Sequence, residues 1–132
     1  MSRLLGSLVL LLLGARAAHA DATVAVAPEE ADAVAARLVG QRIELAADRR
    51  AIRILDVAGE GAPRVGVVVR EGEHLVLVAA DGRWRLSGPL ARARIAGPGY
   101  TVWVIGTIAS GDVPTLTVRR LGVLRRPSLA RH

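Results

Sequence analysis

Residues 65–86, VGVVVREGEHLVLVAADGRWRL, decide the fold because they contain three short β-type segments joined by two turns. The first two segments are apolar on nearly both faces, and the third alternates arginine with an apolar residue. Asp81-Gly82, between the second and third segments, is a strong signal for a two-residue hairpin. Consecutive short strands separated by turn residues predict an antiparallel sheet.

Strand patterns continue on both sides of this stretch. Residues 100–108 (YTVWVIGTI) and 115–124 (TLTVRRLGVL) are rich in β-branched and apolar side chains, and a Ser-Gly-Asp turn lies between them. Residues 42–57 also alternate, with a change of parity near their end that is typical of a bulge. Turn signals about every ten residues predict a mainly β protein, built over residues 42–124 as a five- or six-stranded antiparallel barrel.

The segment before the barrel, residues 21–41, is predicted to contain one amphipathic helix over residues 28–39. Pro28 stands at a favoured first helical position, and Gly40 follows the last turn. Four apolar residues with the spacing of one helical face are Ala31, Val34, Ala35 and Leu38. Because a barrel has only one interior, we expect this face to cover the outer side of the doubly apolar strands. A second protein chain on the same surface is the alternative.

Two segments near the end of the chain resemble the OB-fold. Residues 102–106 (VWVIG) are similar to the V-x-V-x-G run of its fourth strand, and residues 121–124 (LGVL) to the L-x-V-L ending of its fifth. Residues 42–57 resemble its long first strand, so the resemblance covers residues 42–124. The strand at 83–86 departs from the pattern, since it adds a strand before the linking helix; it either extends the third strand or makes a different, six-stranded barrel. The resemblance implies an OB-like barrel and no particular activity, because OB-folds bind oligonucleotides, oligosaccharides and proteins.

The first twenty residues have the features of a secretory signal peptide. Arg3 precedes an uncharged run, Leu4–Leu13, and Ala18-His19-Ala20 matches the small-x-small pattern before a cleavage site. That run is too short for a membrane-spanning helix, which needs about 20 apolar residues. We therefore expect cleavage after residue 20 and export to the periplasm or the medium, with no transmembrane segment in the mature chain. An uncleaved N-terminal anchor is the alternative.

Composition limits the chemistry available to the 132-residue chain. It has no cysteine, which excludes a disulfide scaffold, a thiol enzyme and a cysteine-based zinc site. No serine stands in a G-x-S-x-G elbow. Glu71, Glu73 and His74 crowd one turn, but polar residues are expected at turns. Asp56 has apolar neighbours on both sides. A strand carboxylate that faces outward explains this position without a catalytic role. We therefore predict a non-catalytic protein without a metal or cofactor.

Charge is distributed unevenly along the chain. Residues 21–81 hold seven arginines and eleven carboxylates, whereas residues 82–132 hold nine arginines and one carboxylate. Residues 125–132 are predicted to form a basic tail. Guanidinium groups form forked contacts with carboxylates and phosphates. The predicted ligand-binding residues are Arg83, Arg85, Arg92 and Arg94. A solvated surface, whose charge balances the acidic half, is the alternative.

These features predict an exported, small, non-catalytic binding module. Its expected partner is an acidic protein or an anionic polymer of the cell envelope, and the predicted export disfavours nucleic acid. One alternative is a structural or assembly component of the envelope that associates through apolar strands, and another is an enzyme of unrecognised class. Trp84 and Trp103 are predicted to belong to the core, because large aromatics carry much of a small core's buried area.

Overall fold

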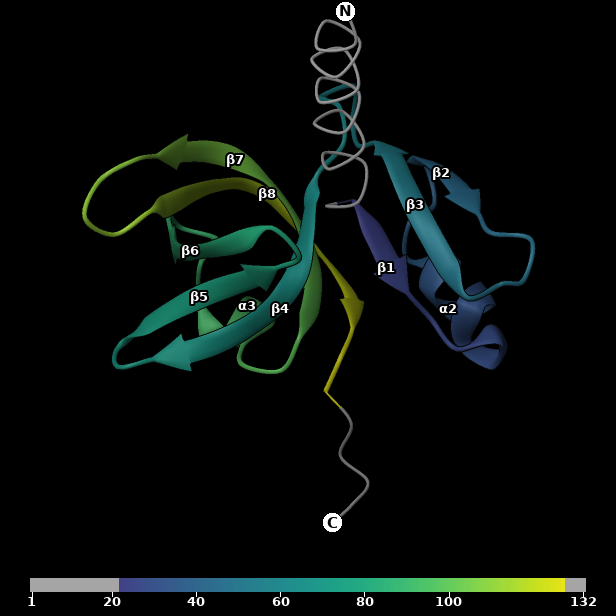
Figure 1. Ribbon diagram of the computed structural model, residues 1–132, viewed down its shortest axis with the longest axis horizontal. Helices are drawn as coiled ribbons and strands as arrows, with labels where there is room; N and C mark the ends of the chain where they lie inside the picture. The colour runs from purple at the N-terminus through teal and green to yellow at the C-terminus, as the bar shows by residue number, and fades with distance from the viewer. Residues whose placement is uncertain (1–21, 128–132) are drawn as a thin grey trace, which may run out of the picture.

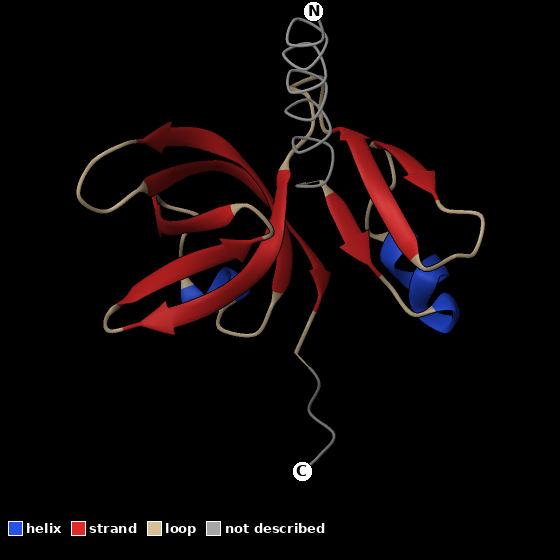
Figure 2. Ribbon diagram, viewed as in Figure 1, coloured by secondary structure: helices blue, strands red, loops and turns tan. Residues whose placement is uncertain are grey.

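The computed structural model describes residues 22–127 and is mainly β (Figures 1 and 2). The predicted signal peptide and residues 128–132 of the predicted tail lie outside the described residues. The strands are β1 (Thr23–Ala25), β2 (Arg42–Leu45), β3 (Ala51–Asp56), β4 (Arg64–Glu71), β5 (His74–Ala79), β6 (Gly82–Ser87), β7 (Thr101–Ala109) and β8 (Thr115–Arg125). The helices are η1 (Pro28–Glu30), α2 (Ala31–Ala36) and α3 (Ala93–Ala96). Between residues 22 and 127, no helix has the length and apolar character needed to span a bilayer.

Five strands form a closed barrel in the order β4-β5-β6-β8-β7, and β7 pairs back onto β4. All neighbouring strands are antiparallel except β6 and β8, which run parallel and pair through Leu86 and Leu116. A parallel pair requires a crossover connection, and the segment holding α3 and β7 provides it. The predicted mainly β class, small barrel and N-terminal helix are confirmed, and the barrel is mixed rather than wholly antiparallel.

The first strand of the barrel is not supplied by residues 42–57, and that prediction is wrong. These residues form β2 and β3, which pair with β1 in a separate three-stranded sheet of order β1-β3-β2. The barrel begins at Arg64, so the strand at 83–86 is its third strand and nothing is added before α3. Alternation of apolar residues shows that a strand has one buried face, but it does not show whether that strand belongs to the barrel or to the separate three-stranded sheet.

A loop anchored by Asp56 separates the two sheets. Its carboxylate accepts hydrogen bonds from the backbone N–H groups of Gly59 at 2.8 Å and Gly61 at 2.7 Å. Both glycines have positive φ angles, 76° and 91°, which other residues rarely adopt. Asp56 therefore has a structural role, because it closes the loop that leads the chain from β3 into β4.

The barrel wall separates two hydrophobic cores. The interior core contains Val68, Leu77, Leu86, Val102, Val104 and Leu116. The second core lies between the outer side of the barrel and the three-stranded sheet, which are seen on the left and right of Figure 1. The barrel contributes Val65, Ile105 and Leu124 to it, and the N-terminal part contributes Val24, Val34, Leu38, Ile52 and Ile54. The small sheet is thus fixed to the barrel by apolar burial.

The predicted helical segment is shorter than expected and covers a different surface. It consists of η1 and the single turn and a half of α2, which contacts β3. Val34 and Leu38 are buried as the spacing predicts, but Val65 is the only residue of the two doubly apolar strands in their cluster. Val67, on the outer face of β4, stays 39% exposed. The three-stranded sheet intervenes, so the helix packs on that sheet instead of covering β4 and β5.

Both tryptophans pack against these cores. Trp84 faces the barrel interior beside its register partner Leu77, and the Arg64 guanidinium lies over its ring, with Cζ 4.5 Å from the ring centroid. Trp103 faces outward into the second core and lies against Gly122. Neither indole is therefore free to act as a surface platform for a planar ligand.

Candidate anion-binding pocket

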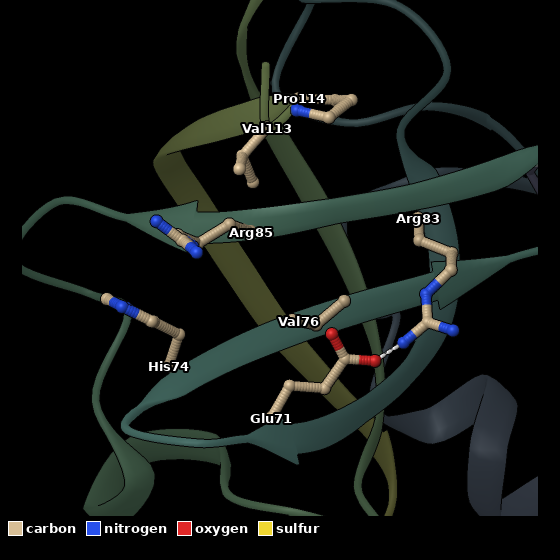
Figure 3. Close-up of a pocket in the computed structure, with 7 residues that line it drawn as sticks. All are labelled: Glu71, His74, Val76, Arg83, Arg85, Val113 and Pro114. Carbon is tan, nitrogen blue, oxygen red and sulfur yellow. Dashed lines mark ion pairs between the residues drawn. The ribbon is translucent and has the colours of Figure 1, made fainter. Parts of the chain in front are cut away.

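A pocket of about 380 Å³ lies on the outer face of β5 and β6 (Figure 3). Two parts of the chain that are distant in sequence form its walls: the continuous stretch from the β4–β5 turn through β5 and β6, and the loop between β7 and β8. The residues that line it are Glu71, His74, Val76, Arg83, Arg85, Val113 and Pro114. Two of the four predicted ligand-binding arginines are among them.

The alternation of β6 places both arginines in this pocket. Successive side chains of a strand point to opposite faces, so Trp84 faces the interior and Arg83 and Arg85 face outward. Arg85 is the register partner of Val76 on β5. The backbone N–H of Arg85 also donates a hydrogen bond to the carbonyl oxygen of Pro114, at 2.9 Å. This bond fixes the β7–β8 loop at the edge of the pocket.

Glu71 and Arg83 form an ion pair within the pocket (Figure 3). Their side chains are 51% and 55% exposed, so water screens this pair strongly. The two side chains meet beside Val76, which is only 6% exposed although it faces away from the barrel interior. The longer side chains around Val76 cover it, and Val76 gives the pocket an apolar floor.

Arg85 differs from Arg83 because its guanidinium is unpaired. Within residues 22–127 this side chain forms neither a hydrogen bond nor an ion pair, although it is half-buried. Its donors are oriented in a rigid fork that suits carboxylate or phosphate oxygens. A half-buried, unpaired guanidinium beside an apolar floor is suited to bind an anion that also carries an apolar group.

The other two predicted residues lie elsewhere. Arg92 precedes α3, and its Nε donates a hydrogen bond to the carbonyl oxygen of Pro89 at 3.0 Å. Arg94 lies on α3 and is exposed. Neither residue lines the pocket that holds Arg83 and Arg85. The four arginines are close in sequence but separate into two pairs on different parts of the surface.

Three residues that line the pocket are not among the predicted ligand-binding residues: Val76, Val113 and Pro114. Val113 is 45% exposed and follows the Ser-Gly-Asp turn, but no pattern in the sequence indicates that this turn lies beside β6. Glu71, one of the three polar residues that crowd the β4–β5 turn, contacts Arg83. In the described part of the chain, no three acidic or histidine side chains are grouped as metal ligands would be.

A second charged cluster pairs arginines of the basic half with the acidic half. Glu60 forms ion pairs with Arg119 and Arg120, and hydrogen bonds from these two guanidinium groups hold the pKa of Glu60 below its usual range. Arg125 forms an ion pair with Glu30. Part of the charge asymmetry of the sequence is therefore neutralised internally. Other described arginines, such as Arg70 and Arg94, also have no partner but are exposed, so Arg85 is distinguished by being both unpaired and half-buried.

No protein-family model matches the chain, and neither a curated protein nor a solved structure is significantly similar to it. The class of the protein is therefore given by its fold: a closed five-stranded mixed barrel joined to a three-stranded sheet and a short helix. Its pocket offers two guanidinium groups, the imidazole of His74 and an apolar floor, and no tryptophan, tyrosine or phenylalanine lines it.

Proposed function

We propose that the barrel is an OB-fold and that the protein is a non-catalytic module binding an anionic ligand through Arg83 and Arg85. The strand order, the parallel closing pair β6–β8 and the position of α3 between the third and fourth barrel strands support the assignment. In OB-folds the ligand surface is formed by the second and third strands, with the loops after the first and fourth strands. The corresponding elements here are β5, β6, the β4–β5 turn and the β7–β8 loop, and these line the pocket.

The observation that carries the proposal is the unpaired guanidinium of Arg85. Burying part of a charged group without a partner is unfavourable, because hydration is lost and nothing replaces it. An anionic ligand supplies the missing acceptor and gains charge-assisted hydrogen bonds, which are stronger than neutral ones. Arg83 adds a second fork two residues away on the same strand face.

We also propose that the protein works outside the cytoplasm, in the periplasm or the medium, after cleavage of residues 1–20. This rests on the sequence pattern around Leu4–Leu13. The partner is then an acidic protein or an anionic envelope polymer. The chemistry of the pocket supports this choice, since single-stranded nucleic acid is usually bound by stacking bases on aromatic side chains, and the pocket has one imidazole, that of His74, and no tryptophan, tyrosine or phenylalanine.

The experiment that tests the proposal compares two charge-matched variants. Binding of poly-L-glutamate to the purified protein is measured by calorimetry for Arg85→Gln and Arg94→Gln. Hydrogen bonds to charged groups contribute about 1.5–3 kcal/mol, so we expect Arg85→Gln to weaken binding at least about tenfold. Arg94→Gln removes the same charge from outside the pocket and should change the affinity less than about twofold. Equal losses in the two variants would show non-specific attraction and contradict the proposal.

A further inference from the structure

We infer that Glu71 is an internal competitor for the ligand, and that the ligand is an extended acidic peptide whose carboxylate replaces Glu71 on Arg83. This inference rests on the function proposed above. It concerns how the pocket is regulated and which class of anion it selects.

The position of Glu71 supports displacement. Glu71 is the last residue of β4, next to the turn at Gly72, and its side chain is half-exposed. Exposed ion pairs contribute little to stability, so opening this one costs the folded protein little. The Arg83 side chain reaches Glu71 in the same pocket that Val76 lines (Figure 3). A ligand that takes the place of Glu71 therefore gains both a guanidinium and contact with the apolar floor.

The surroundings of the two arginines select a peptide. The Glu71 carboxylate shows that Arg83 can hold a carboxylate in this pocket. Val76, Val113 and Pro114 offer apolar contacts that inorganic phosphate or a sulfated polysaccharide has no group to use. The only aromatic ring among the lining residues is the imidazole of His74, and the pocket has none of the larger tryptophan, tyrosine or phenylalanine rings on which bases and sugars usually stack. An aliphatic side chain next to a carboxylate satisfies both parts of the pocket.

The spacing of the arginines selects an extended conformation. Arg83 and Arg85 are two residues apart on one face of β6, about 7 Å along the strand. Alternate side chains of an extended peptide share one side with the same separation. Acidic residues at alternate positions can thus meet Arg85, which is unpaired, and Arg83, once Glu71 has left. We therefore expect a segment with two alternate carboxylates and an aliphatic residue on the same side.

A charge-matched pair of variants tests the competition. The probe is a labelled pentapeptide with leucine at its first position, glutamate at its third and fifth, and serine between them. Glu71→Gln frees Arg83 and should tighten peptide binding about fivefold, the upper range for releasing an exposed ion pair. Glu73→Gln removes the same charge from an exposed position in the same turn and should leave the affinity within about twofold of the wild type. Equal effects of the two variants would overturn the competition.

Two further measurements separate this inference from the proposed function. In the Arg83→Gln background, Glu71→Gln should give no gain, because the guanidinium that Glu71 occupies is gone. Polyphosphate binding as tightly as the peptide at equal charge, or no loss of affinity when serine replaces the leucine, would overturn the peptide assignment.

If Arg85→Gln weakens poly-L-glutamate binding while Glu71→Gln and Glu73→Gln are equivalent, the proposed function stands and the competitor role of Glu71 fails. If Arg85→Gln has no effect, the proposed function itself fails.

Discussion

Replacing Gly122 with alanine should destabilise the protein through the contact between the barrel and the small sheet. A Cβ at this position would lie 2.2 Å from Nε1 and 2.3 Å from Cε2 of Trp103. The indole is held in the core shared with the three-stranded sheet, so it cannot move away without losing buried area. Overpacking of this kind costs about 1–3 kcal/mol. That is a substantial part of the total stability of a small domain, about 5–15 kcal/mol.

Urea unfolding followed by circular dichroism measures this cost. Gly111→Ala is the matched control, because a Cβ there meets nothing within 4 Å and the glycine has no positive φ angle. It should change the free energy of unfolding by no more than about 0.5 kcal/mol. Replacing Trp103 with leucine should relieve the strain, so Gly122→Ala should cost much less in that background. If Gly122→Ala is as stable as Gly111→Ala, the indole does not lie across β8 and the reasoning is refuted.

Three other predictions follow from the described contacts and the sequence. Ile54→Ala, which empties a fully buried position between the small sheet and the barrel, should lower the free energy of unfolding by about 2–5 kcal/mol in urea titration, and a smaller loss would contradict the shared core. Because the pKa of Glu60 is lowered from 4.5, its contribution is present above that pH and is lost as pH falls through the folded pKa. Wild type should therefore lose more stability than Glu60→Gln on acidification below pH 4.5, and parallel pH profiles would contradict the pairing. N-terminal sequencing of protein from its native host should begin at or near Asp21, and an intact Met1 would refute export.

The elements of the barrel could be predicted from the sequence because their signals are local. The alternation after the predicted hairpin correctly places Trp84 inward and the arginines beside it outward, but the two-residue turn is Ala80-Asp81, one residue earlier than predicted, and Gly82 begins β6. The partner sheet of Ile52 and Ile54 could not be predicted in the same way. Their alternation requires one buried face, and long-range packing alone decides whether the barrel interior or the N-terminal helix covers it.

The candidate pocket could likewise be predicted from the sequence only in part. Strand alternation predicts that Arg83 and Arg85 share one outer face, and both line the pocket on that face. Arg92 and Arg94 were grouped with them by sequence proximity, but they follow the end of β6 and do not line the pocket. Val113 becomes a pocket residue only because the β7–β8 loop folds back onto β6, with the Pro114 carbonyl accepting from Arg85. No local pattern encodes that approach.

The central claim is that the anionic ligand binds on the outer face of β5 and β6. Amide chemical shifts of the isotope-labelled protein, recorded while the acidic pentapeptide is added, test it most directly. Binding at this face should give saturable chemical-shift changes at Arg83, Arg85 and Val113, with little change around Arg94 on α3. Shifts concentrated around Arg94, or spread evenly over all arginine-bearing surfaces without saturation, would contradict it.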